Sequence, residues 1–212
     1  MAGILDILNS DTGKTLISGA SKQFRQDEGK TTIALSTALP LILGAMKNNA
    51  STPEGASGLL SALGNDKHSG GILDNLGSIL GGGEVNQDVL DDGAGILGHI
   101  FGGKEQRVAN AVSKSSGIDM DTAMNILKVA GPLVMGALGK ETRQKDISDQ
   151  NGIGDLLGGM LIGASNDQQS LITKLLDADG DGSIIDDVAG MILSGDKKKG
   201  GLGGMLGGLF GK

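Results

Sequence analysis

The stretch ALPLILGAM, residues 38–46, recurs ninety-two residues later as AGPLVMGAL, residues 130–138. Polar residues ahead of each stretch match at the same offset: Ser21-Lys22 with Ser113-Lys114, and Asp27 with Asp119. Leu, Ala and Met favour helix, so each stretch reads as a buried core helix. The sequence therefore predicts an internal duplication. The alternative is chance similarity between two helices rich in Leu and Ala.

Each predicted core helix carries a proline near its middle, Pro40 in the first copy and Pro132 in the second. Proline removes a backbone donor, so we expect each helix to be kinked or broken there. In the second copy Asp119 or Asp121 is expected to cap the helix N-terminus. Its core side chains are expected to be Met124, Leu127, Val129, Leu133, Val134 and Leu138. Gly44 and Gly136 are expected to allow close helix approach.

A shorter glycine-rich apolar pattern appears five times, at residues 3–8, 71–81, 95–102, 152–161 and 201–211. In the last, the apolar residues follow helical spacing and form one stripe opposite nearly bare glycine: Leu202, Met205, Leu206, Leu209 and Phe210. One interpretation is that all five are short helices docking on the main core. The other is that the terminal copies mediate self-association, with residues 196–212 packing on a neighbouring subunit or a lipid surface.

Local signals divide the chain further. Thr52 is a predicted N-cap with Pro53 at the first helical position, and loops are predicted at residues 65–70, 81–93 and 141–151. We expect three parts: a duplicated helical core at residues 1–140, a helical hairpin at 141–195, and a glycine-rich amphipathic tail at 196–212.

The composition excludes several functions. Eighteen basic against 25 acidic residues give a net charge of −7, which argues against binding nucleic acid or anionic membrane. The chain has no Cys, Trp or Tyr and three Phe, so it lacks thiol chemistry and almost all stacking surfaces. The longest apolar stretches have nine residues, short of the roughly 20 that cross a bilayer. With no secretory signal in view, a soluble cytoplasmic protein is expected.

Residues 177–188, DADGDGSIIDDV, carry the one motif with recognisable chemistry. Alternating aspartates followed by glycine form the first half of an EF-hand calcium loop, in which carboxylates converge on one cation. Val188 stands where the bidentate Glu is normally found, so affinity should be modest. The predicted ligands are Asp177, Asp179, Asp181 and the Ser183 carbonyl, with Asp186 or Asp187 as a monodentate substitute. The alternative is an Asp/Gly turn that only caps the next helix.

Candidate catalytic groups are few. His68 lies in a polar run and His99 in an apolar repeat, and no nucleophile elbow accompanies them. Residues 98–105 have phosphate-loop spacing, but Glu105 replaces the required Ser or Thr. We therefore expect no catalytic residues and no enzyme.

Several strings resemble the YidB-like bacterial family of unknown function: residues 39–44, 49–56, 71–77, 96–102 and 131–138. The resemblance covers roughly residues 20–195, and the 177–187 string is similar to longer members. It implies a multihelical, all-α fold and carries no activity and no catalytic residues. Together with the motifs above, the expected architecture is a duplicated pair of Pro-kinked core helices followed by a C-terminal helix-loop-helix.

Two functions follow from these features. The first is a non-enzymatic, self-assembling homo-oligomer whose glycine-rich amphipathic helices form subunit contacts and whose acidic loop is stabilised by calcium. The second is a calcium-responsive binding module in which the hairpin at 166–193 controls exposure of an apolar face to a partner.

Overall fold

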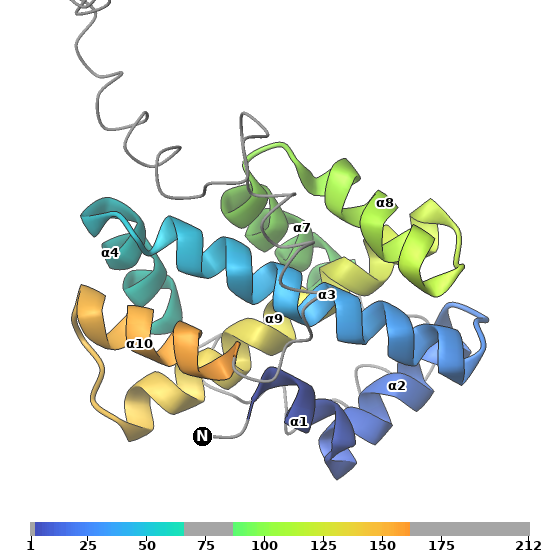
Figure 1. Ribbon diagram of the computed structural model, residues 1–212, viewed down its shortest axis with the longest axis horizontal. Coiled ribbons are helices and arrows are strands. Elements are labelled where there is room, and N and C mark those ends of the chain that lie inside the picture. Colours follow the sequence, from blue (N-terminus) through green and yellow to red (C-terminus); the bar gives the residue numbers. More distant parts are fainter. Residues whose placement is uncertain (1–2, 66–86, 162–212) are drawn as a thin grey trace, which may run out of the picture. The chain divides into compact units, whose positions relative to one another are not determined.

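The computed structural model describes residues 3–65 and 87–161, all within the compact unit Met1–Leu176. Every regular element in these ranges is a helix (Figure 1), which confirms the all-α, multihelical fold. The helices are α1 (Ile4–Asn9), α2 (Asp11–Gln23), α3 (Glu28–Asn49), α4 (Pro53–Leu63), α7 (Gln87–Phe101), α8 (Glu105–Ser116), α9 (Met120–Gln144) and α10 (Gln150–Met160).

The helices fall into two sets of four in the same order, α1 to α4 and α7 to α10. The long helices α3 and α9 begin ninety-two residues apart, at Glu28 and Met120. Asp27 caps α3 by accepting from the Gly29 and Lys30 amides, and Asp119 caps α9 by accepting from the Thr122 amide. The offset seen in the sequence is thus the offset between equivalent helices.

The loops ahead of α3 and α9 repeat the same backbone geometry. Ser21 Oγ donates to the Gln26 carbonyl at 2.6 Å, and Ser113 Oγ donates to the Ile118 carbonyl at 2.6 Å. Between these partners, Arg25 has φ +51° and its counterpart Gly117 has φ +69°. Only glycine adopts this left-handed conformation without steric cost, so the second copy makes the turn with less strain.

The core lies where α3 and α9 cross near the middle of the described fold (Figure 1). Pro40 and Pro132 are both buried inside helices that continue past them, so of the two predicted outcomes, a kink or a break, the break is wrong. A proline inside a helix costs about 3 kcal/mol. Burial of long apolar faces on both helices outweighs that cost, because each buried Leu or Ile side chain contributes about 1.5–3 kcal/mol.

Other local predictions have mixed outcomes. Thr52 does cap α4 with Pro53 at its start. The predicted loop at 141–151 was too long, since α9 runs to Gln144 and α10 begins at Gln150. The loop predicted at 81–93 was also wrong after residue 86, where α7 starts, because its glycine and aspartates are tolerated on a helix held by packing.

Within the chain, the short last helix of each set of four packs on the long core helix of the other set. α4 packs on α9 and α10 packs on α3, so each core helix is covered by a helix from the other copy. Polar contacts also join the two sets: Arg143 Nη1 donates to the Leu63 carbonyl at 3.2 Å, and Gln150 Nε2 donates to the Ser51 carbonyl at 2.9 Å. The two sets of four helices therefore form one folded body.

Three of the five glycine-rich patterns lie in described helices and dock on the core, as the first interpretation expected. α1 buries Ile4 and Leu8, α7 buries Leu97 and Phe101, and α10 buries residues such as Ile153. The N-terminal pattern is therefore a docked helix of its own chain, which corrects the idea that both terminal copies are free for association. The patterns at 71–81 and 201–211 lie outside the described residues.

The helices containing the apolar stretches are longer than the stretches themselves. α3 and α9 have 22 and 25 residues, and their most apolar windows have mean hydropathies of 1.2 and 1.3. By length and composition alone both pass as candidate membrane spans, a test that the buried core helix of a globular protein also passes. Of these windows, 72% and 78% are buried inside the protein, as expected for core helices.

Candidate functional site

The residues predicted from the sequence to form sites lie outside the described ranges. This holds for the acidic loop, for the stripe from Leu202 to Phe210, and for His68. Within residues 3–65 and 87–161, no group of three or more His, Asp or Glu side chains is placed to hold a metal ion. The calcium site and the tail contact therefore stay predictions.

In the segment with phosphate-loop spacing, residues 98–105, the Glu105 carboxylate accepts a hydrogen bond from the backbone of the glycine turn. Gly103 N donates to Glu105 Oε1 at 3.1 Å, so the carboxylate occupies a backbone amide of the glycine turn. His99 is exposed in the last turn of α7, and its carbonyl accepts from Asn49 Nδ2 at 3.4 Å. The hydrogen bonds at this end of α7 are thus made by backbone groups at the end of a helix, as at His99 and Gly103.

Glycines of the short helices fall into two classes. A Cβ at Gly58 in α4, at Gly95 in α7 or at Gly154 in α10 would meet nothing within 4 Å. A Cβ at Gly98 would meet Glu105 Oε1 at 3.9 Å. A Cβ at Gly93, in contrast, would overlap the Lys128 backbone. Packing on α9 explains why residue 93 is glycine. No contact within the described fold explains why Gly58, Gly95 and Gly154, which we call the outward glycines, are glycine.

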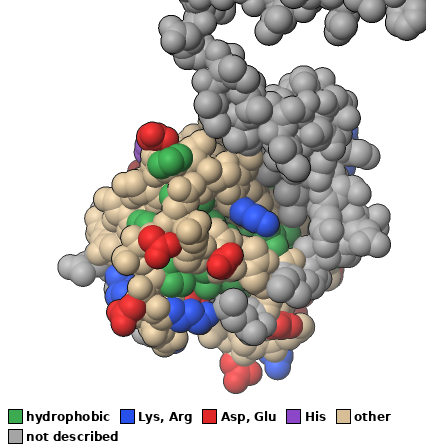
Figure 2. Space-filling view, turned by 60° about the vertical axis from the view of Figure 1, so that its left-hand side comes forward, with side chains coloured by type: hydrophobic (Ala, Val, Ile, Leu, Met, Phe, Trp, Pro, Cys, Tyr) green, Lys and Arg blue, Asp and Glu red, His purple; other side chains and the backbone are tan. Residues whose placement is uncertain are grey.

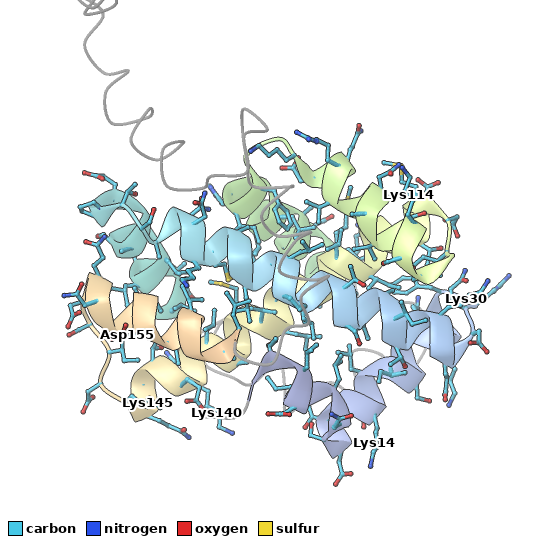
Figure 3. The ribbon with its side chains drawn as sticks, in the orientation of Figure 1. Lys14, Lys30, Lys114, Lys140, Lys145 and Asp155 are labelled. Atoms are coloured by element: carbon cyan, nitrogen blue, oxygen red, sulfur yellow. The ribbon has the colours of Figure 1, made fainter. Side chains whose placement is uncertain are left out.

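The fully exposed residues of α4 and α10 are mostly small or polar: Pro53, Glu54, Ser57, Gly58, Ser61, Asn151 and Asp155. Figure 2 shows the side of the molecule that carries these helices, where backbone and small polar groups dominate and charges of both signs are scattered. In Figure 3, Lys140 and Lys145 lie near the end of α9 and Asp155 lies on α10, all pointing outward. Lys145 Nζ, at the C-cap of α9, pairs with Glu141 Oε2 in the last turn at 2.7 Å.

Beneath α1 the described fold contains a small apolar cavity of about 20 Å³. Ile4 and Ile7 of α1 form one wall. We call the remaining walls the α1 slot; they come from α2, α3 and α9 and consist of Thr12, Gly13, Leu16, Leu39, Leu133, Val134 and Ala137. α1 itself has only six residues, and its first turn is closed by the Gly3 amide, which donates to Asp6 Oδ2 at 2.7 Å.

A wider, open groove of about 710 Å³ runs beside α8. Its described lining consists of Gln106, Arg107, Asn110, Ala111, Lys114, Ser115 and Met120. Met120 is one of two large apolar side chains exposed in the described residues; the other is Ile33. The groove thus joins two cations and two amides with an exposed apolar side chain.

The pKa of Asp119, at the start of α9 near this groove, is below its ordinary value. The main cause is the Thr122 hydroxyl, which donates to Asp119 Oδ2 at 2.7 Å, followed by the Thr122 amide, which donates to Oδ1 at 2.8 Å. Both bonds favour the ionised carboxylate. Asp119 is therefore a helix cap that is charged at neutral pH.

These features define an all-helical protein built from two four-helix units that share one core. A family model described as "Bacterial protein of unknown function (DUF937)" matches residues 6–141, so the chain belongs to this bacterial family. The match begins and ends earlier than the resemblance at residues 20–195, and it does not include the acidic loop. No curated protein and no solved structure matches the chain.

Two features of the fold were not predicted from the sequence. The first is the close crossing at Gly93, which lay in a predicted loop. The second is the α1 slot, which forms from segments far apart in the chain. The sequence did contain a signal that α1 and α7 are equivalent helices, because Gly3 and Gly95 are separated by the same ninety-two residues as the two core helices.

Proposed function

We propose that this protein is a non-enzymatic structural protein of the bacterial cytoplasm that assembles with copies of itself through glycine-rich helix faces. The observation that carries this proposal is the set of outward glycines, Gly58, Gly95 and Gly154, whose Cβ positions meet open space. Glycine inside a helix costs about 1 kcal/mol relative to Ala. If the backbone of a helix from another copy packs closely against these positions, glycine is required there. Within the single chain no contact requires it.

Charge supports a role for calcium in the same assembly. Each chain carries a net charge of −7, so copies repel one another at low ionic strength. Aspartates at 177, 179, 181, 186 and 187 concentrate five of the negative charges in one segment. A divalent cation bound there would lower the repulsion and order the loop at the same time.

The alternative is a calcium-responsive binding module that exposes an apolar face to a partner. The groove beside α8 favours this second function, because Met120 is exposed there beside Arg107 and Lys114. On this alternative calcium changes binding of a partner while the protein keeps the mass of one chain.

Light scattering tests the proposal through the molar mass in millimolar calcium and in excess chelator. We expect a multiple of the 21.3 kDa chain mass in calcium, and a smaller mass after deletion of residues 196–212. The double variant Gly95→Gln with Gly98→Gln should also lower the mass, because its side chains block close helix approach. Thr15→Gln, on an exposed position of α2 away from the glycine faces, is the control. A single-chain mass in both buffers would rule out assembly.

A further inference from the structure

The groove beside α8 carries two cations that pair with no acidic side chain in the described ranges. Arg107 and Lys114 are both exposed on α8, and Figure 3 shows Lys114 on the outer side of the helix. Seven residues separate them, so they lie about 10 Å apart on one face of the helix. With the exposed Met120 beside them, these cations favour an acidic ligand that also covers an apolar side chain.

α7 carries the complementary charge. It contains three aspartates and neither Lys nor Arg, so it is the most acidic of the described helices. Four of its exposed residues stand at i, i+3, i+7 and i+10, a spacing that places them on one side of a helix, away from the buried Leu97. We call them the α7 stripe: Asp88, Asp91, Gly95 and Gly98.

We propose that the α7 stripe of one copy packs in the groove beside α8 of a second copy. This inference rests on the proposed function, since it names a contact that joins the copies. The two helices run antiparallel in this contact. The acidic first turns of α7 then lie against Lys114 near the C-terminus of α8, where the helix dipole also favours opposite ends meeting.

Small residues lie at the centre of the contact on both sides. Ala111 stands between the two cations of the groove, three residues before Lys114, and Gly95 stands four residues after Asp91. In the antiparallel arrangement Gly95 therefore faces Ala111. The distance between two packed helices depends on the side chains at the contact, so this pair allows a close approach.

The contact also accounts for two features that the single chain leaves unexplained. Gly95 gains the close neighbour that it lacks in the described fold, where a Cβ would meet open space. Met120 lies just beyond the C-terminus of α8, so the first turns of the incoming α7 cover it. Because stripe and groove are different surfaces, each copy binds two neighbours, which produces rings or open filaments.

Charge reversal on each side tests the contact by light scattering in calcium. Arg107→Glu with Lys114→Glu makes the groove acidic, and Asp88→Lys with Asp91→Lys makes the stripe basic. Each variant alone should fall towards the 21.3 kDa mass of one chain. An equimolar mixture of the two should recover the large mass, because each variant offers the other one unmodified pair and one reversed pair of complementary surfaces.

Net charge is controlled in two ways. The stripe variant adds four positive charges and moves the net charge from −7 to −3, so general repulsion between copies weakens while the proposed contact is lost. Lys22→Glu with Arg25→Glu, at exposed positions in and after α2, makes the same charge change as the groove variant and should keep the large mass. All variants should retain the helical content and unfolding temperature of the unmodified chain.

A cross-link tests the contact without changing the paired charges. The chain has no Cys, so Ala94→Cys beside the stripe and Asn110→Cys in the groove are introduced into separate chains, both at exposed positions. These are mixed with a short bismaleimide, and the linked peptides are identified by mass spectrometry. We expect this link to form at least about tenfold faster than one between Ala94→Cys and Thr15→Cys, because docking raises the local thiol concentration towards millimolar.

The outcomes separate this contact from the proposed function. A large mass that persists in either reversed variant overturns the contact and leaves assembly standing. Loss of mass in both variants without recovery on mixing also overturns it, as does a control that loses mass like the groove variant. If a reversed variant does not fold, a cross-link no faster than its control decides against the contact. A single-chain mass for the unmodified protein overturns both contact and assembly.

Discussion

The backbone of Gly93 in α7 lies directly against the backbone of Lys128 in α9, at the carbonyl four residues before Pro132. In a regular helix that carbonyl accepts from the amide of residue 132, but proline has no N–H to donate. The proline and the glycine thus meet at one crossing, where α7 and α9 pack. In the second copy, the carbonyl that Pro132 leaves without a helical donor is therefore the one that Gly93 approaches.

Gly93→Ala should destabilise the protein by about 1–3 kcal/mol, the usual cost of overpacking a rigid site. The added methyl would overlap backbone atoms of α9, which have no alternative rotamer to adopt. Gly95→Ala, two residues along the same helix, should be stabilising by up to about 1 kcal/mol, because its Cβ meets open space. Urea unfolding of each variant measures both effects; equal effects would contradict the close crossing.

The duplicated serines should contribute unequally to stability. Ser21→Ala removes a donor to the Gln26 carbonyl at a buried position, and we expect a loss of about 1 kcal/mol. Ser113→Ala removes the equivalent bond to Ile118, but Ser113 is only half-buried, so water can replace the donor at lower cost. Thermal unfolding of the two single variants checks the order. A larger loss at Ser113 would contradict it.

Asp119 should give α9 a pH-dependent stability. Its folded pKa is lowered, so its contribution is present above the unfolded carboxyl pKa of about 4 and is lost as the pH falls through the folded pKa. Asp119→Ala should therefore cost about 1 kcal/mol at pH 7, the typical value of an N-cap. The difference from the unmodified chain should shrink below pH 4, as measured by urea unfolding across pH.

Asp119→Asn separates the cap from the charge. Asparagine still accepts the Thr122 amide, so this variant should lose less stability at neutral pH than the alanine variant. Its stability should also lack the component that titrates near the carboxyl pKa. If both variants lose the same stability at every pH, the hydrogen bonds to Thr122 do not account for the lowered pKa.

Calcium binding should depend on the alternating aspartates. Asp179→Asn with Asp181→Asn should abolish calcium binding measured by titration calorimetry, because two carboxylate ligands are lost. The unmodified loop should bind with a dissociation constant of roughly 10⁻⁴–10⁻³ M, since Val188 replaces the bidentate Glu. Asp155→Asn on the exposed face of α10 removes one charge elsewhere and should leave binding unchanged. Binding that survives in the double variant would contradict an EF-hand-like site.

Much of the local structure was predictable because it depends on neighbours in sequence. The caps at Thr52 and Asp119 follow from side chains that accept the next free amides. The boundaries of α7 and α9 were less predictable, because glycine and charge favour loops in isolated segments. Burial of Leu97 against the core makes residues 87–93 helical despite their composition.

By itself the sequence determined that this protein is all-helical and duplicated, because helical periodicity, caps and a constant offset are properties of the chain read in order. The tertiary structure alone decided that α4 covers α9 while α10 covers α3. It also decided which glycines are crossing points, as at Gly93, and which face open space, as at Gly95. Local propensity sets which segments become helices, but the partner of each helix depends on contacts between residues distant in sequence.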